Sequence, residues 1–289
     1  MPTEDELVSA DADARAILAD PGYVVPSAPP ADQTGTLAWL RAHVARFCEG
    51  EAHDRRRRLA EQEIAGLDPA GLRQSAAART TAELARHPSS EPFDVMPLAR
   101  RVPAAALAAG LGVPADDIAG AVDAVLGAMS GYLNPDLAGP YADSSVALLA
   151  KSLGPGEPEL LANRIGLLMQ ACDATAALIG NALIAAFAFD GSVEEIIART
   201  LSDDPPALRT RRISPHGELV TIDISGCTFG AGRRPCPGAD QAKALAAGVL
   251  DAILACCELA DQQIGYLPSP NLRMPASLLV TPGQAAASR

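Results

Sequence analysis

Apolar side chains recur at helical spacing along most of the chain, and this pattern predicts a mainly α-helical protein. The stretches that show it most clearly are 37–48, 66–90, 118–133, 160–190 and 239–259. Residues 1–20 start with the same spacing, but the prolines between positions 21 and 30 interrupt it. We therefore expect a partly extended N-terminal segment, 1–34, followed by a single domain over 35–289.

A short run with β character, Leu219–Ile224, precedes a loop rich in glycine and arginine, Phe229–Gly238. The loop reads F-G-x-G-x-R-x-C-x-G. Its glycines permit tight turns and a close approach of the backbone to a flat ligand. Arg234 places a cation near Cys236, and the start of the following helix-like run favours thiolate further. The loop is therefore expected to present one anionic, axial sulfur ligand.

Other interpretations of this loop fit less well. A dinucleotide-binding fingerprint needs a third glycine where Pro235 stands, and no strand–helix–strand repeat surrounds it. A structural zinc site needs paired cysteines at short spacing, which the sequence lacks. A buried, inert cysteine is the remaining alternative, although a loop with two arginines is an unfavourable place for one.

The same ten residues resemble the loop that carries the proximal haem ligand in the cytochrome P-450 family, with every fixed position of that pattern present. The resemblance implies a mainly α, compact cytochrome P-450-like helical fold with reduced β-sheet content. It also implies haem b (iron protoporphyrin IX) as the cofactor of the 35–289 domain. Cys236 would be the iron ligand, with Phe229 and Arg234 in the cofactor-binding loop.

Basic residues in two other segments match family positions that bind the haem propionates. His53 and Arg57 lie four apart and share one face of a helix, as in the family's His-x-x-x-Arg. Arg211 or Arg212, between which the sequence does not choose, resembles an arginine on a strand that binds the other propionate. A solvated basic surface is the alternative for both segments.

The apolar run 160–190 resembles the family's long distal helix, in which A-G-x-[D/E]-T lies beside the bound oxygen. Thr175 matches the threonine, so Thr175 and Asp173 are the candidate catalytic residues. Cys172 replaces the glycine and Ala174 the acid. Asp173 lies one step earlier, which turns a side chain by about 100° around a helix. Delivery of protons to bound oxygen is therefore the step that these changes affect. A membrane-spanning helix and an ordinary core helix are the alternatives for this run.

Two further departures from the family concern the region between the distal helix and the cysteine loop. The E-x-x-R motif is out of register, because Ala198 stands where Glu195 requires the arginine and Arg199 follows it. Glu195 and Arg199 remain one helical turn apart and could pair. The interval between Thr175 and Cys236 is also short, which predicts deletions in the β-sheet regions.

Composition limits the partners. The net charge of −12 and pI of about 4.7 argue against nucleic acid and against an anionic membrane. The N-terminus is acidic without the pattern of a signal peptide, and the six cysteines are scattered apart from Cys256-Cys257. Both features predict a reducing, cytoplasmic location.

The resemblance implies oxidation of a small organic molecule, a monooxygenase-type step in a biosynthetic pathway, with a ferredoxin-type redox partner or peroxide. Two rival functions remain open. One is haem-thiolate chemistry of another class, either peroxide-dependent or that of a dehydratase or isomerase, which the changes at positions 172 and 174 favour. The other is a non-catalytic relative that acts as a partner protein, which the short chain and the altered E-x-x-R favour.

Overall fold

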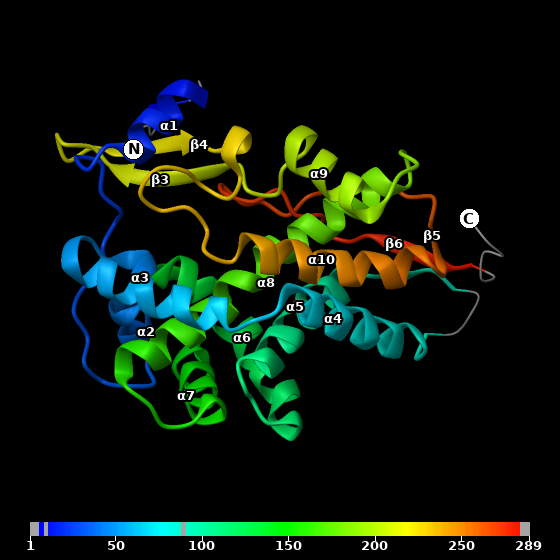
Figure 1. The fold of residues 1–289 in the computed structure, drawn as a ribbon, viewed down its shortest axis with the longest axis horizontal. Coiled ribbons are helices and arrows are strands. Elements are labelled where there is room, and N and C mark those ends of the chain that lie inside the picture. The colour runs from blue at the N-terminus through cyan, green and yellow to red at the C-terminus, as the bar shows by residue number, and fades with distance from the viewer. Residues whose placement is uncertain (1–5, 9–10, 88–90, 284–289) are drawn as a thin grey trace. The chain divides into compact units, whose positions relative to one another are not determined.

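The computed structural model describes residues 6–8, 11–87 and 91–283, and helices dominate it (Figure 1). The mainly α prediction is confirmed. The predicted start of the chain includes residues 1–5 and 9–10, which lie outside the described residues, and the proposed boundary at residue 34 stays a prediction. The helices are α1 (Asp11–Ala19), α2 (Leu37–His43), α3 (Gly50–Ala65), α4 (Pro69–Leu84), α5 (Met96–Gly110), α6 (Ile118–Leu133), α7 (Ala142–Leu153), α8 (Pro158–Ala186), α9 (Val193–Asp203) and α10 (Ala239–Leu254).

The strands form two small sheets. In the first, β1 (Glu6–Val8) runs parallel to β4 (Leu219–Asp223), and β3 (Arg209–Ile213) pairs with β4 in the antiparallel sense. In the second, the antiparallel order is β2-β6-β5, with bounds Phe93–Asp94, Leu279–Pro282 and Cys257–Leu259.

Three predicted helices end earlier than expected. The helix expected over 37–48 ends at His43 and the one expected over 66–90 ends at Leu84, with residues 88–90 outside the described residues. The helix expected over 239–259 ends at Leu254, because residues 257–259 pair with β6 instead. The apolar character that suggested a longer helix is also what a half-buried strand needs.

The chain divides into two compact units, and α8 runs from the first into the second. Unit 1 comprises Met1–Gly66, Ala108–Gln170 and Arg209–Gly238, and unit 2 comprises Leu67–Leu107, Ala171–Leu208 and Ala239–Arg289. The cysteine loop, α3 and the first sheet all belong to unit 1.

Unit 1 is held together near the candidate site by ion pairs between α3 and the start of α8. The Glu159 carboxylate accepts hydrogen bonds from Arg55 at 2.6 and 2.7 Å and from Arg56 at 2.9 Å. The two guanidinium groups hold the pKa of Glu159 at about 2, mainly through the hydrogen bond from Arg55. Part of the arginine run thus serves to dock α3 rather than to form a solvated face.

In unit 2, α4 and α10 lie side by side (Figure 1). Gly248 of α10 permits the close approach, because a Cβ there would overlap the backbone carbonyl of Arg73 on α4. The Arg73 side chain crosses the same interface to Asp251, with Nε 2.7 Å from the carboxylate. A small residue and an ion pair therefore fix this helix pair.

The helix α8 is long and apolar enough to cross a membrane by length and composition, but 72% of its most apolar window is buried inside the protein. Among its side chains that are completely enclosed are Ile165, Leu168 and Leu183. This burial favours the core-helix interpretation of the 160–190 run.

Replacing Glu159 with Gln should lower the free energy of unfolding by about 1–2 kcal/mol, because two guanidinium groups lose their carboxylate. The pKa of Glu159 is lower in the folded state than its ordinary value of 4.5. Its stabilising contribution is therefore complete above about pH 4.5 and disappears as the pH falls toward 2. Urea unfolding of both proteins between pH 3 and 7 would show their stabilities converging at low pH, and a gap that stays constant with pH would contradict this origin.

Candidate functional site

The cysteine loop has a defined backbone that depends on its glycines. Gly230 and Gly232 have φ angles of +77° and +65°, which side-chain-bearing residues rarely adopt. A Cβ on Gly232 would also overlap the carbonyl of Leu18. The loop closes on itself through the Cys236 N–H, which donates to the Phe229 carbonyl at 2.7 Å, while the Phe229 ring is half-buried. The geometry presents residue 236 just before α10.

The Cys236 side chain is exposed, yet the protein atoms around it raise the pKa of its thiol. Desolvation is the largest cause. A hydrogen bond from the Gly238 backbone and the charges of Arg57 and Arg46 act in the opposite direction but do not compensate. This direction is opposite to the one expected for the loop by itself. A metal ion bound to a sulfur supplies a further positive charge that favours thiolate.

Arg234 is not among the charges that lower the pKa of Cys236, and its guanidinium is engaged by other groups. It donates to the carbonyls of Ala45 at 3.3 Å and Cys48 at 2.5 Å, and one Nη lies 2.8 Å from the Glu49 carboxylate. The side chain is only 11% exposed. Arg234 therefore anchors the cysteine loop to the segment before α3.

The structure separates the two candidate arginines of β3. Successive side chains on a strand point to opposite faces, and Arg212 is buried whereas Arg211 is exposed. Burial and the nearby charge of Arg234 lower the pKa of Arg212 to about 10. Its guanidinium donates to the Thr210 hydroxyl at 3.1 Å and the Arg211 carbonyl at 2.8 Å. Among the described residues, no carboxylate forms an ion pair with it.

His53 and Arg57 both lie on α3, as predicted, but in different surroundings. His53 is buried, and desolvation followed by the charge of Arg234 lowers the pKa of its imidazole. Its Nδ1 lies 3.1 Å from the Asp54 carboxylate. Arg57 donates to the Glu61 carboxylate and to the Pro235 carbonyl, both at 2.6 Å. Arg57 thus also holds the cysteine loop, directly beside residue 236.

These contacts create a buried excess of positive charge. The cations are Arg212 and Arg234, with Arg233 at the edge, and Glu49 is the carboxylate that faces them. One oxygen of Glu49 accepts from the Val25 N–H at 2.7 Å, so this carboxylate is shared with the backbone. A buried unpaired charge is costly, and the cluster is therefore suited to an anionic ligand.

The two candidate catalytic residues lie on the part of α8 that belongs to unit 2, and their polar groups are not joined. The Asp173 carboxylate accepts from Arg100 of α5, with Nε at 2.9 Å and Nη2 at 2.8 Å. Thr175 is buried. The Cys172 thiol is also buried, and desolvation raises its pKa to about 12. In the described structure, the Asp173 carboxylate therefore pairs with α5, and it forms no hydrogen bond with Thr175.

The alternative pairing in the altered E-x-x-R segment is not formed. The Glu195 carboxylate accepts from the Ser192 N–H at 2.8 Å in a capping box at the start of α9. Arg199 lies 3.3 Å from Asp203 and covers the ring of Phe189. Local capping satisfies Glu195 better than a surface ion pair would.

Sequence reasoning missed Glu49 and Arg100. Glu49 lies one helical turn before His53, and an acid so close to a basic run could have been flagged as its counter-charge. Arg100 is one of two arginines in an otherwise apolar helix, which suggests a buried acidic partner. Neither signal identifies the partner, because each pair joins segments far apart in the sequence.

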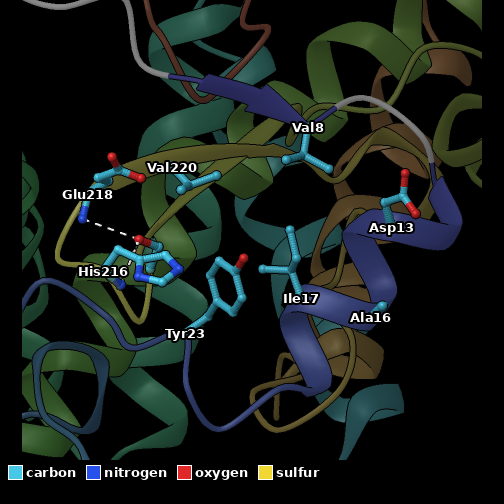
Figure 2. A pocket seen from close by; sticks show the side chains of 9 residues that line it. Val8, Asp13, Ala16, Ile17, Tyr23, His216, Glu218 and Val220 are labelled. Carbon is cyan, nitrogen blue, oxygen red and sulfur yellow. Dashed lines mark hydrogen bonds between the residues drawn. The ribbon is translucent and has the colours of Figure 1, made fainter.

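A separate cavity of about 420 Å³ lies elsewhere in unit 1, between α1 and the first sheet (Figure 2). Val8, Ile17 and Val220 give it apolar walls, and Tyr23 and His216 point toward it. None of the predicted site residues lines this cavity, so it is distinct from the cysteine loop.

Replacing Arg212 with Met should leave the haem-free protein as stable or more stable, by about 1 kcal/mol, because it removes a buried cation without a paired carboxylate. The matched control is Arg211→Met on the exposed face of the same strand, expected to change stability by less than about 0.5 kcal/mol. Chemical unfolding of the three haem-free proteins measures this. A loss of more than about 2 kcal/mol in the Arg212 variant alone would show that its charge is balanced.

Comparison with protein-family models gives no match, and neither does comparison with curated proteins. Solved structures do match over nearly the whole chain. The cytochrome P-450 enzyme CxnD, described for C–S bond formation in chuangxinmycin biosynthesis, has a TM-score of 0.77 and 16% identity, covering 98% of this chain and 90% of its own.

Two further matches agree. The cytochrome P-450 RauA, complexed with a biosynthetic intermediate of aurachin RE, gives a TM-score of 0.76 at 17% identity, with 96% and 91% of the two chains covered. A thermophilic cytochrome P-450 from Sulfolobus tokodaii gives 0.71 at 18% identity, with 97% and 95% covered. Identities this low establish the fold and not the chemistry. The resemblance of the cysteine loop is thus confirmed at the level of architecture, and this chain has the cytochrome P-450 fold.

Proposed function

We propose that this chain is a haem-thiolate oxidoreductase that binds haem b through Cys236 and oxidises a small organic molecule. The observation that carries the proposal is the buried excess of positive charge at Arg212 and Arg234, within the same unit as the cysteine loop. The two propionates of a metalloporphyrin would balance the positive charge of the arginines. Its metal would supply a positive charge that favours thiolate at Cys236. The cytochrome P-450 fold supports the same assignment.

The residues present fit haem in their chemistry. Arg212 and Arg234 are permanent donors for carboxylates. His53 donates through Nδ1 to the Asp54 carboxylate, so its other ring nitrogen can donate to a propionate only in the protonated imidazole, a form that the negative charge of a propionate would favour. Arg57 is proposed to assist from the edge of the loop. When bound, haem would supply chemistry that cleaves an O–O bond, and Cys236 would hold the iron as thiolate, a ligand whose electron density favours that cleavage.

The chain's own residues have separate tasks in this proposal. The Gly238 N–H donates to the Cys236 sulfur and stabilises its negative charge. Arg57 fixes the neighbouring Pro235 carbonyl and keeps the sulfur oriented. Thr175 and Asp173 are proposed to line the distal side, where a small-molecule substrate binds. The 35–289 region acts as the haem-binding domain of a cytoplasmic protein, supplied with electrons by a ferredoxin-type partner or with oxygen by peroxide.

The absorption spectrum of the purified protein, first ferric and then reduced under carbon monoxide, tests the proposal. Haem-loaded protein should show the red-shifted Soret band of a thiolate-ligated ferrous carbonyl complex. Cys236→Ala should lose this band, whereas Cys227→Ala, a half-buried thiol in the segment before the loop, should keep it. In titrations with haem, Arg212→Met should weaken affinity by about tenfold to a hundredfold and Arg211→Met by less than twofold.

A protein that stays colourless after haem is supplied would overturn the proposal and leave the non-catalytic partner function. A carbonyl spectrum unchanged in Cys236→Ala would overturn the assignment of the ligand alone.

A second function within the same class is favoured by the pairing of Asp173 with Arg100 and by Ala174. Ala174 stands where the resemblance places the acid that delivers protons. The carboxylate of the neighbouring Asp173 is held by Arg100 of α5. Chemistry that does not depend on dioxygen and a reductase, such as oxidation driven by peroxide, does not need this delivery step.

Turnover under two regimes distinguishes these functions. If peroxide is the oxidant, haem-loaded protein should oxidise a test substrate with peroxide, and Asp173→Asn should change that rate by less than about twofold. Asp190→Asn, an exposed carboxylate beyond α8, is the control. Turnover with dioxygen and a reductase but not with peroxide, lost in Asp173→Asn alone, would establish the monooxygenase and give Asp173 its proton-delivery role.

A further inference from the structure

Two adjacent cysteines, Cys256 and Cys257, occupy the junction between α10 and β5 in unit 2 (Figure 1), at the opposite end of α10 from the cysteine loop. Their sulfur atoms lie 3.8 Å apart, within the range of a thiol–thiol hydrogen bond. Two sulfurs held this close form a dithiol rather than two independent side chains.

The two thiols differ in access. Cys256 is half-buried, so a small reagent can reach it, whereas Cys257 is buried. Desolvation, followed by the neighbouring sulfur, raises the pKa of Cys257 to about 12. Cys256 is therefore the sulfur that meets a reagent first, and Cys257 is a partner kept as neutral thiol.

The backbone around the pair depends on its present geometry. The Cys256 carbonyl accepts from the Gly283 N–H at 2.7 Å, and Cys257 pairs with Pro282 across β5 and β6. The Cys256 N–H donates to the Ile253 carbonyl at 3.2 Å as α10 ends. A covalent change at these sulfurs would act directly on the point where α10 joins the second sheet.

We propose that Cys256 and Cys257 form a modification site at which a hydroperoxide oxidises the dithiol to a disulfide between adjacent residues. The Cys256 sulfur attacks one peroxide oxygen, the O–O bond breaks, and with hydrogen peroxide the released hydroxide takes up the thiol proton as water. Cys257 then attacks the resulting sulfenic acid, the S–O bond breaks, and a second water leaves with its proton. Two thiols lose two electrons and two protons, and the peroxide gains them.

This disulfide is strained and hence readily reversible. Adjacent Cα atoms lie about 3.8 Å apart across a trans peptide, below the range of about 4.4–6.8 Å usual for disulfides. Strained disulfides have higher reduction potentials than structural ones. A thiol reductant such as glutathione should therefore restore the dithiol, as a regulatory site requires and a structural disulfide does not.

Peptide mapping of the intact protein tests the proposal without reference to haem, so its failure is distinguishable from failure of the proposed function. The tryptic peptide 244–273 contains these two cysteines and no others. After mild treatment with hydrogen peroxide and alkylation, this peptide should have lost two hydrogens and carry no alkyl group. Reduction with glutathione before alkylation should give the doubly alkylated peptide. Two alkylated cysteines after peroxide, or a disulfide from either to a distant cysteine, would overturn the proposal.

Single variants test the order of attack. In Cys257→Ser, Cys256 should stop at the sulfenic acid, which dimedone traps. In Cys256→Ser, the buried Cys257 should remain reduced at the same dose. Equal dimedone labelling in the two variants would contradict the assigned roles. Cys227→Ser, which removes a half-buried thiol of unit 1, should leave disulfide formation in peptide 244–273 unchanged.

A trivalent arsenical gives an independent readout, because it chelates two neighbouring sulfurs far more tightly than one. Phenylarsine oxide should bind the native protein at this pair, resist a monothiol and be removed by a dithiol. Each single cysteine-to-serine variant should lose that resistance. Binding that persists in both variants would place the dithiol elsewhere and overturn the proposal.

Discussion

The candidate site depends on a single electrostatic constraint, the burial of two guanidinium groups near the Glu49 carboxylate. Arg212 comes from a strand and Arg234 from the cysteine loop, and Glu49, just before α3, pairs with Arg234 and acts on Arg212 through its charge alone. Because burying an unbalanced charge is costly, the positions of these three segments are linked energetically. The arrangement brings the cysteine loop, β3 and α3 to one place and leaves a deficit of negative charge there.

The same charge balance explains why the pKa of the Cys236 thiol is raised, although its motif suggests a lowered pKa. Arg234 is committed to Glu49 and to two carbonyls, so desolvation determines the pKa of Cys236 and raises it. A protein that bound its sulfur as free thiolate would have a reactive nucleophile at its surface. The raised pKa favours the neutral thiol at Cys236.

Short connections lead to the cysteine loop. In the described residues the two sheets have three strands each, and the loops between α9, β3, β4 and the cysteine loop are short. Several helix ends and helix pairs are secured by local interactions. The Ser192–Glu195 capping box begins α9, Gly248 permits the packing of α4 on α10, and Glu159 docks α8 on α3.

The sequence by itself determined most of the helices, the run that became β4, and the segments that carry the candidate site, but it did not indicate α7. These follow from short-range properties: helical periodicity, the F-G-x-G-x-R-x-C-x-G spacing, and glycines whose positive φ angles the loop requires. The sequence did not determine where α10 ends. The pairing of residues 257–259 with β6 competes with the helix, and β6 lies some distance further along the chain.

Only the tertiary structure decided the choice between Arg211 and Arg212, the engagement of Arg234 away from the sulfur, and the pairing of Asp173 with Arg100. Each of these is a matter of which charges face one another after burial. Charge pairing in a folded protein joins residues from distant segments, and its strength depends on desolvation, which no local pattern encodes. Spacing along the chain therefore predicts which residues can take part in the site, whereas the packing of helices and strands sets their partners and their ionisation.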